Sequence, residues 1–469
     1  MTRLASPVED IQPHYEVIVI GSGYGGGIAA SRLARAGRQV CVLERGKEWL
    51  PGEYPDTELE GLPEIQVRLG DQVLGLRTGL YDVRVSEDMN VLIGCGLGGT
   101  SLINANVASR PERRVFDDPR WPIDFRRDVD TLLNQCFDRA ETMLGSKPYP
   151  DRLPVTRKMA AHDRSGAALN GKTYRLPLNI TFEDGVNNVG VQQAACKLCG
   201  DCMSGCNHGA KNTVIMNYLP DAKRHGAVIF TQVEVRYLER QNNRWIVHYQ
   251  MLDTGREGFD APTATVSADL VILAAGTLGT NEILLRSKAA GLPLSDRLGR
   301  NFSGNGDVLG FAYNNDVEIN MLGFGPRDPD QQEPVGPTIT TAIDLREQPN
   351  LEDGMIIEEG GVCAPLAAFM PKTLSLAAKL AGRDTDEGLA DAINEKRREL
   401  DALIRGAYYG AVRNTQVYLV MAHDESAGTL TLENDHLQIK WPGAGDRPYI
   451  KRVNEKLMTA TKPLGGTFV

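Results

Sequence analysis

The chain carries four cysteines in one short stretch, at Cys196, Cys199, Cys202 and Cys206. Their spacing, C-x2-C-x2-C-x3-C, is the one by which bacterial iron–sulfur proteins surround a cluster with thiolates. Gly200 and Gly205 lie between these cysteines and allow the tight turns that such wrapping needs. The same thiols could instead hold zinc, stay reduced and unliganded, or form labile disulfides. Metal binding, with an iron–sulfur cluster as the favoured occupant, is therefore the first chemistry that the sequence suggests.

The fourth cysteine of this run raises a difficulty. In two-cluster ferredoxins it serves the other cluster, whereas this sequence has no second run of the kind. Either Cys206 folds back onto the same cluster, or the site holds three irons, or a remote ligand completes it. Cys95 and Cys363 are the candidates for a remote ligand.

Three glycines near the start of the chain, Gly21, Gly23 and Gly26, have the spacing G-x-G-x-x-G. An apolar run at residues 17–20 precedes them, a helical pattern follows, and a second apolar run ends in Glu44. In such a βαβ unit the glycines permit a tight turn, close approach of a pyrophosphate, and close packing of helix on strand. The pyrophosphate binds the free N–H groups at the helix start, and Glu44 would accept the ribose hydroxyls. The sequence therefore predicts a dinucleotide site rather than an ordinary βα turn.

A second glycine-rich segment covers residues 94–104 and contains Gly94, Gly98, Gly99, Ser101 and Asn104. Glycines let the backbone approach a flat ligand closely, as a flavin ring requires, and the hydroxyl and amide groups add hydrogen bonds. The apolar residues within this segment argue against a flexible surface loop. A later buried strand, at residues 269–273, also runs into a glycine turn, at Ala275 and Gly276. We expect the turns at 21–26, 94–104 and 275–277 to converge around one flavin nucleotide.

Size and composition restrict the class of protein. The chain has 469 residues, a net charge of −10 and a pI near 5.4, which argue against a nucleic-acid-binding protein. No apolar run reaches the ~20 residues of a membrane-spanning helix, and residues 1–10 lack the layout of a secretory signal. The bunched cysteines do not form a secreted disulfide framework. We therefore expect a cytoplasmic protein.

Taken together, these segments resemble the glucose–methanol–choline (GMC) flavin oxidoreductases, on the cholesterol oxidase-like branch, from about residue 15 to the end. The resemblance implies that the βαβ unit with Glu44 binds the adenosine half of FAD. It also implies that residues 94–104 contact the flavin, with Asn104 as the contacting asparagine, and that the backbone at Val233 meets the adenine. An active-site glutamate is implied at Glu358 or Glu359, and the residues alone do not choose between them.

The implied fold class is α/β: a Rossmann-like, doubly wound FAD-binding domain plus an α+β substrate domain with an antiparallel sheet. The FAD-binding domain is expected at residues 1–110 and 191–310, with 47–90 as a loop or cap, and the substrate domain at 111–190 and 311–445. Residues 128–144 and 374–405 are predicted to be helical. Residues 416–421 and 428–432 are predicted to be paired strands, and His162 a solvated helix residue.

The implied reaction is oxidation of a CH–OH group: a base takes the hydroxyl proton while hydride passes to flavin N5. In sterol-oxidising members the glutamate also moves a proton to isomerise a double bond, which would place the protein in steroid metabolism. The expected substrate is a sterol-like or other bulky apolar alcohol. The alternatives are a sugar or polyol dehydrogenase, and a non-catalytic flavin and iron–sulfur electron-transfer protein. If the cysteines hold a cluster, we expect a partner protein that accepts electrons.

One segment departs from the family pattern. In the family a histidine in a His-Pro-Leu-Gly-Gly segment and a later asparagine hold the substrate hydroxyl. This chain ends with a similar segment at residues 462–466, but Lys462 stands in the place of the histidine. We therefore expect the sequence to be truncated, with residues 446–469 starting the family's C-terminal FAD-domain segment and the catalytic histidine and asparagine absent.

Overall fold

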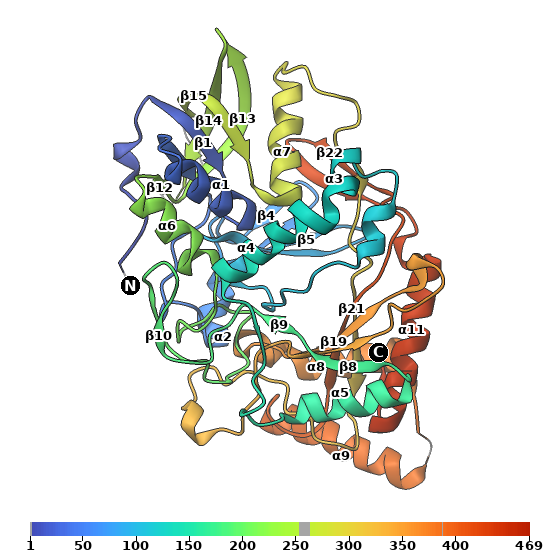
Figure 1. Ribbon diagram of the computed structural model, residues 1–469. Helices are drawn as coiled ribbons and strands as arrows, with labels where there is room; N and C mark the ends of the chain where they lie inside the picture. The colour runs from blue at the N-terminus through green and yellow to red at the C-terminus, as the bar shows by residue number, and fades with distance from the viewer. Residues whose placement is uncertain (1, 253–262, 387) are drawn as a thin grey trace.

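The computed structural model describes residues 2–252, 263–386 and 388–469. Figure 1 shows two layered regions, one containing β1 and α7 and the other containing β19, β21 and the helices α5, α9 and α11. The model confirms the predicted fold class, a Rossmann-like region joined to a region built on an antiparallel sheet. In the described part of the chain, no helix has both the length and the hydrophobicity needed to cross a lipid bilayer.

The first region is built on a sheet with the strand order β12-β2-β1-β15-β14-β13, in which β12, β2, β1 and β15 are parallel and the other pairings antiparallel. The strands are β1 (His14–Ile20), β2 (Val40–Leu43), β12 (Val228–Phe230), β13 (Val233–Gln241), β14 (Arg244–Met251) and β15 (Ala264–Leu273). β1 and β2 are almost wholly buried, as their apolar, β-branched residues require of parallel strands.

Helices cover both faces of this parallel sheet. α1 (Tyr24–Arg35) and α6 (Tyr218–Arg224) pack on one face through small and aliphatic residues such as Ala30 and Leu219. α7 (Gly276–Ala289) contributes Ile283 to the core on the other face. Both α1 and α7 begin where a parallel strand ends, so both helix N-termini lie at the carboxyl edge of the sheet, where α/β proteins bind ligands.

Residues 47–90, which we expected to be a loop or cap, contain strands. They contribute to a small sheet with the order β4-β3-β5-β6, and its members are β3 (Ile65–Leu69), β4 (Gln72–Leu74), β5 (Tyr81–Val85) and β6 (Val91–Gly94). A short helix, α2 (Glu58–Gly61), precedes them. The turn signals at Pro51, Gly52 and Pro55 belong to the loop before the first of these strands. They therefore do not argue against strands in the rest of the segment.

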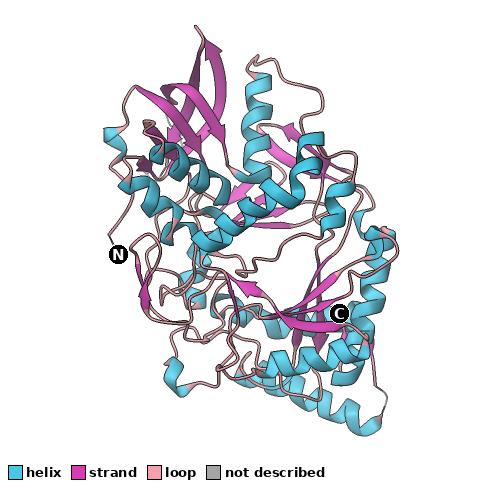
Figure 2. Cartoon of the chain, viewed as in Figure 1, coloured by secondary structure: helices cyan, strands magenta, loops and turns pink. Residues whose placement is uncertain are grey.

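The second region is an antiparallel sheet with the strand order β20-β24-β17-β21-β19-β18-β8. The strands are β8 (Lys172–Arg175), β17 (Val308–Tyr313), β18 (Thr341–Asp344), β19 (Ile356–Gly360), β20 (Arg383–Asp384), β21 (Gln416–Met421) and β24 (Thr467–Phe468). One face packs on the helices α5 (Arg157–Ala168), α8 (Met370–Ala381), α9 (Leu389–Arg405), α10 (Gly410–Arg413) and α11 (Pro448–Thr461). In Figure 2, viewed as in Figure 1, α5 and α9 lie below the magenta strands, α11 stands beside them, and the parallel-sheet region lies above.

Two predictions about this part of the chain are wrong. Residues 428–432 do not pair with 416–421: β22 (Gly428–Glu433) pairs with β23 (His436–Lys440) and β16 (Arg300–Phe302), and these strands pack against α7 through Trp441 and Leu278. Residues 446–469 do not start an FAD-domain segment: α11 and β24 complete the core of the antiparallel-sheet region, where Leu457 and Phe468 are buried. Residues 462–466 form the turn between α11 and β24.

The remaining differences concern two predicted helices, each of which is interrupted, and several short strands. The predicted helix at 128–144 is interrupted by a π-helical turn at Val129–Leu133, with α3 (Ile123–Asp128) before it and α4 (Asn134–Leu144) after it. The other short strands are β7 (Lys147–Pro148), β9 (Pro177–Leu178), β10 (Gly185–Val186) and β11 (Gln192–Gln193). The predicted helix at 374–405 is two helices, α8 and α9, separated by β20.

Candidate functional site

The three glycine turns converge on one cavity of ≈ 310 Å³ at the carboxyl edge of the parallel sheet. Of the residues predicted to bind the nucleotide, those that line it are Gly21, Gly23, Glu44, Gly94, Gly99, Val233, Ala275 and Gly276. The other four, Gly26, Gly98, Ser101 and Asn104, lie outside the lining and support it. The convergence expected from the sequence is therefore confirmed, although the segments are separated by up to about 250 residues.

Two glycines of the first turn, Gly23 and Gly26, have different surroundings. A Cβ atom at Gly26 would lie 2.0 Å from the carbonyl oxygen of Gly21, so this position is needed for packing. A Cβ atom at Gly23 would meet nothing within 4 Å, and the same holds for Gly276. Because Gly23 and Gly276 both line the cavity, the space beside them is open to a ligand.

The carboxylate of Glu44 is buried and held by the first glycine turn. It accepts hydrogen bonds from Ser22 Oγ at 2.6 Å and Ser22 N at 3.1 Å, and its other oxygen accepts one from Gly46 N at 2.8 Å. Ser22 Oγ in turn accepts a hydrogen bond from Gly98 N at 2.9 Å. Ser22 thus joins Glu44 to the second glycine segment, a role that sequence reasoning missed because only the glycines of that turn carry the motif.

Ser101 and Asn104 hold the second glycine segment in place rather than lining the cavity. Ser101 Oγ donates to Gly98 O at 2.6 Å and accepts from Val214 N at 3.1 Å. The side-chain amide of Asn104 donates to the Tyr24 hydroxyl at 3.0 Å. Since Tyr24 lines the cavity, Asn104 acts on the cavity through this tyrosine in the present geometry.

A network of buried ion pairs forms one wall of the cavity, and sequence reasoning missed it. Asp82 accepts a hydrogen bond from Arg45 at 2.7 Å, and Glu282 on α7 accepts one from Arg84 at 3.1 Å. Arg84 on β5 lies directly opposite Arg68 on β3. Burial alone would raise the pKa of Glu282, but the neighbouring guanidinium groups outweigh it and hold that pKa well below its usual range. Burial and the like charges of Arg45 and Arg84 lower the pKa of Arg68 to about 10.

This network joins the small sheet to α7 through the contacts of Arg68 and Arg84 with Glu282. The only sequence signal for it is the alternation of charged residues in strands β3 and β5, where Asp82 and Arg84 share one face. Charges on alternate positions of a strand usually indicate a solvated face, which explains why the pattern was not recognised.

The adjacent glutamates of β19 have opposite surroundings. Alternate residues of a strand face opposite sides of a sheet. Glu359 shares its face with Ile357, in the core shared with the helices, and Glu358 shares its face with Ile356, in the core that includes Leu198 of the cysteine segment. Glu358 therefore lies on the face turned away from the helix layer.

Glu359 is fully satisfied, whereas Glu358 is not. One oxygen of Glu359 lies 3.0 Å from Lys158 Nζ, and the other accepts hydrogen bonds from the backbone N–H groups of Thr340 at 3.0 Å and Thr341 at 2.9 Å. Glu358 is 1% exposed, and its Oε1 has no hydrogen-bond partner among the described residues. Burial, with the nearby charge of Glu359, raises the pKa of Glu358 to about 8.

His162 was expected to be solvated, and this prediction is wrong. The ring is fully buried on α5, with Nδ1 2.9 Å from Thr341 Oγ1. Burial, followed by the charge of Lys158 one turn away, lowers its pKa to about 3. His162 is therefore a neutral core residue beneath the antiparallel sheet.

A second cavity, of ≈ 190 Å³, lies at the cysteine run, and all four of its cysteines line it. Leu198 N donates to the sulfur of Cys196 at 3.4 Å, and Leu198 has φ +57°, so the chain turns sharply between the first two cysteines. Burial raises the pKa of Cys196, Cys199 and Cys206, so as free thiols they would be protonated. A metal centre would displace those protons on binding.

The arrangement of the sulfurs bears on the alternatives left open by the sequence. Neither Cys95 nor Cys363 lines the cysteine cavity, whereas Cys206 does, so the run folds back on itself. Within the described ranges, no three cysteine sulfurs lie within 4.8 Å of one another. A tetrahedral zinc ion with Zn–S bonds of about 2.3 Å needs sulfurs about 3.8 Å apart. The arrangement is wider than a preformed zinc cage.

The cysteine segment is fastened to loops of the antiparallel-sheet region. Phe324 N donates to Cys199 O at 2.9 Å. The carboxylate of Asp201, between the second and third cysteines, accepts hydrogen bonds from Gly325 N at 2.9 Å and Ala364 N at 2.8 Å. The cavity is therefore held at the junction between the two regions of the molecule.

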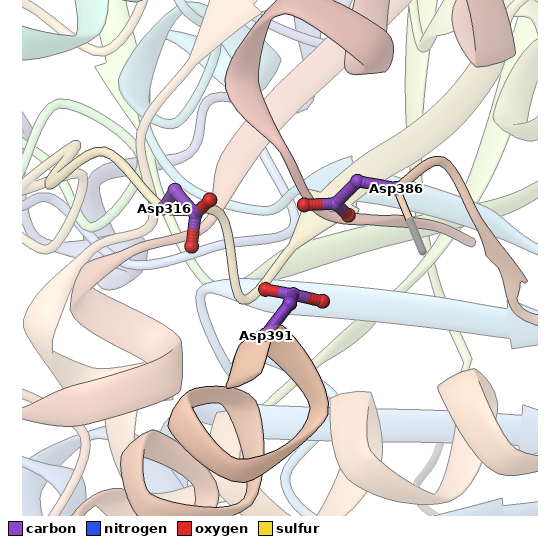
Figure 3. Close-up of side chains that lie close together, drawn as sticks. All are labelled: Asp316, Asp386 and Asp391. Carbon is purple, nitrogen blue, oxygen red and sulfur yellow. The ribbon is translucent and has the colours of Figure 1, made fainter. Parts of the chain in front are cut away.

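A separate acidic cluster lies on the antiparallel-sheet region, away from the lining of both cavities. Figure 3 shows the carboxylates of Asp316, Asp386 and Asp391 turned toward one another, and their oxygens lie within 4.8 Å of one another. Burial, followed by the charge of Asp391, raises the pKa of Asp386 to about 6. Burial and neighbouring carboxylates raise the pKa of Glu395 to about 7.

Comparisons with known proteins agree with this geometry. A cholesterol oxidase from Mycobacterium tuberculosis is 33% identical over 316 residues, which cover 62% of this chain and 51% of that protein. A cholesterol oxidase from Acinetobacter baumannii is 28% identical over 330 residues, which cover 64% and 56%. The solved structure of pyridoxine 4-oxidase from Mesorbium loti aligns with a TM-score of 0.54 and 16% identity over 96% of this chain and 80% of that chain, a likeness that shows the fold alone. The chain spans about half the length of the curated relatives that it matches.

A family model described as GMC oxidoreductase matches residues 23–304. The match begins inside the first glycine turn and includes the second glycine segment, the cysteine run and the turn at Ala275 and Gly276. It confirms the resemblance predicted from those residues. The chain therefore belongs to the GMC oxidoreductase family, whose members bind FAD.

Proposed function

We propose that this protein binds FAD and oxidises the CH–OH group of a sterol-like or other bulky apolar alcohol. The observation that carries the proposal is the convergence of three glycine turns on one cavity at the carboxyl edge of a parallel sheet. Cholesterol oxidases among the relatives support the choice of substrate class. When bound, FAD would supply the hydride acceptor for this reaction.

The residues around the cavity suit this cofactor. The free N–H groups in the first turn of α1 would bind the pyrophosphate, beside the open space at Gly23. Glu44 retains lone pairs for ribose hydroxyls, because an ionised carboxylate can accept about four hydrogen bonds. The backbone at Val233, which lines the cavity, would meet the adenine. The glycines of residues 94–104 would lie against the flavin.

We assign to Glu358 the removal of the substrate hydroxyl proton. A general base needs a free carboxylate in a sheltered position, and Glu358 is buried with one oxygen unpartnered, whereas Glu359 is paired with Lys158. The cross-strand neighbours of Glu358 are Ala342 and Leu419. This apolar row favours a bulky apolar alcohol over a sugar.

One observation favours the sugar or polyol alternative. A surface groove beside Asp307, a residue close enough to raise the pKa of Glu358, is lined mainly by polar side chains. They include Asp118, Arg120, Asn301, Ser303, Asn305, His423 and Asp424. A substrate with many hydroxyl groups would find partners there.

The test is flavin reduction under anaerobic conditions. The purified protein is mixed with a 3β-hydroxysteroid, a long-chain alcohol, or glucose, and the absorption of oxidised flavin is followed. Bleaching by the steroid or long-chain alcohol supports the proposal, and bleaching by glucose alone supports the sugar alternative. Bound FAD that no alcohol reduces would indicate a non-catalytic flavoprotein.

We further propose that Cys196, Cys199, Cys202 and Cys206 hold an iron–sulfur cluster through which electrons pass to a partner protein. All four cysteines line one cavity, a backbone N–H donates to the sulfur of Cys196, and the sulfurs are spread more widely than zinc requires. Such a protein would act as a dehydrogenase in the cytoplasm. Iron and acid-labile sulfide analysis of anaerobically purified protein tests this, and metal-free protein that produces peroxide rapidly would contradict it.

A further inference from the structure

A buried lysine connects the cysteine cavity to the second glycine segment. Lys211 follows the cysteine run, lines its cavity, and is only 2% exposed. Its Nζ donates to Cys202 O at 2.8 Å, Leu102 O at 2.8 Å and Asn104 O at 2.7 Å. An ammonium group has three N–H donors, so all of them are used, and they join the two segments directly.

The charge of this lysine has no protein counter-ion. Its three acceptors are neutral carbonyl groups, and none of its hydrogen bonds in the described ranges goes to a carboxylate. The acidic residue within the cysteine run, Asp201, accepts hydrogen bonds instead from the backbone of Gly325 and Ala364. A buried ammonium without a counter-ion costs free energy, and an iron–sulfur core held by four thiolates would supply the missing negative charge in the cavity that Lys211 lines.

The contacts continue from Lys211 to the nucleotide cavity. Three residues beyond it, Val214 N donates to Ser101 Oγ at 3.1 Å. Gly98, in the middle of the glycine segment, donates to Ser22 Oγ at 2.9 Å, and Ser22 donates to the Glu44 carboxylate. A contiguous set of hydrogen bonds therefore leads from the cysteine loop to both glycine turns, and networks of this kind can carry energetic coupling between two sites.

We propose that Lys211 is a positioning residue that makes cluster binding and FAD binding cooperative. Its ammonium group balances the charge of the cluster and, through the carbonyl groups of Leu102 and Asn104, holds the flavin-contacting segment in its binding conformation. This inference rests on the proposed iron–sulfur site and FAD site. It adds that each cofactor increases the affinity for the other, since coupling between two binding sites is reciprocal.

The test compares FAD affinity with and without the cluster. Deflavinated protein is titrated with FAD before and after anaerobic reconstitution with iron and sulfide, and the dissociation constant is read from flavin fluorescence. In the natural protein we expect affinity about tenfold higher after reconstitution. In K211M the difference disappears and the midpoint potential of the cluster falls, because a nearby positive charge that favours the reduced state has been removed. K211R, which keeps the charge, retains most of both effects.

The matched control is K223M. Lys223 lies on α6 of the same region and donates to Ser6 Oγ at 3.0 Å, away from both cavities. We expect it to behave like the natural protein in both measurements. Equal FAD affinity with and without the cluster in the natural protein overturns the coupling, and needs no variant. A difference that persists in K211M overturns the role of Lys211. Failure to bind iron and sulfide overturns this inference while leaving alcohol-driven flavin reduction as a separate test of the oxidoreductase proposal.

Discussion

Lys158 Nζ lies 3.0 Å from Glu359 Oε1, and both side chains are fully buried between α5 and the antiparallel sheet. Glu359 is therefore paired, whereas the adjacent Glu358, on the opposite face of β19, has an oxygen without a hydrogen-bond partner among the described residues. Two residues with the same chemistry therefore have different environments because a strand alternates its faces. One is a structural residue, and we propose that the other is the base.

Replacing Lys158 with methionine should destabilise the protein strongly. The change leaves the Glu359 carboxylate buried and uncompensated, which typically costs about 3–5 kcal/mol in the free energy of unfolding. The measurement is urea denaturation at neutral pH. K47M is the control, since the Lys47–Glu64 pair is partly exposed and should contribute less than about 1 kcal/mol. Equal losses of unfolding free energy in K158M and K47M would show that the buried pair contributes no more to stability than the partly exposed pair.

Replacing Glu358 with glutamine should abolish most alcohol-driven flavin reduction while leaving the protein folded. Loss of a general base typically lowers the rate by about 10²–10⁴-fold. The amide fits the same space as the carboxyl group but cannot accept the hydroxyl proton. FAD affinity should not change. E359Q is the comparison: it should lower stability by weakening the bonds to Lys158 and the backbone, and an activity loss confined to E359Q would reverse the assignment.

Two glycine-to-alanine changes in the first turn should separate folding from ligand binding. At Gly23 an added Cβ atom meets no protein atom within 4 Å but enters the cavity, so G23A should keep the natural melting temperature and lose FAD affinity by about tenfold or more. At Gly26 the Cβ atom would lie 2.0 Å from the Gly21 carbonyl oxygen, so G26A should lose both thermal stability and FAD affinity. Thermal melts and FAD titrations distinguish the two outcomes. Retained FAD affinity in G23A would place the nucleotide elsewhere.

The acidic cluster of Asp316, Asp386 and Asp391 predicts a specific pH dependence of stability. The native pKa values of Asp386, about 6, and Glu395, about 7, lie above the ordinary values of 3.8 and 4.5. Between about pH 4 and pH 7 the native state therefore binds more protons than the unfolded state, and stability falls as the pH rises through this window. D391N should flatten this slope and raise the melting temperature at pH 7, because it removes one repelling charge.

The control for the acidic cluster is D71N, in the exposed turn between β3 and β4, where the carboxylate belongs to no cluster. It should leave the slope unchanged. If D391N and the natural protein lose stability in parallel between pH 4 and pH 7, the raised pKa values do not arise from this cluster.

Much of the fold and of the nucleotide cavity could be predicted because short-range spacing encodes them. The G-x-G-x-x-G turn, the apolar run before it and Glu44 at the end of the next strand are local features of a βαβ unit, and the structure contains each of them. The second glycine segment and the turn at Gly276 were recognised in the same way. The cysteine run was recognised from spacing alone, and its four members line one cavity.

Other predictions were wrong because their outcome depends on distant contacts. His162 sits on a helix face whose burial is set by the sheet beneath it, some 180 residues later in the chain. The strand at 428–433 finds its partners in β16 and β23 rather than in the strand just before it, because α7 offers an apolar surface there. Periodicity indicates that a residue is on a strand or helix, but it does not say which element covers it.

The sequence by itself determined the family, the parallel-sheet unit and the two candidate cofactor segments, since each depends on residue types at fixed short spacings. Only the tertiary structure distinguished Glu358 from Glu359, brought Arg68, Arg84 and Glu282 into one wall, and placed Lys211 between the cysteine loop and the glycine segment. The physical reason is that burial, charge pairing and hydrogen bonding join groups far apart in the chain, and local spacing contains no record of those contacts.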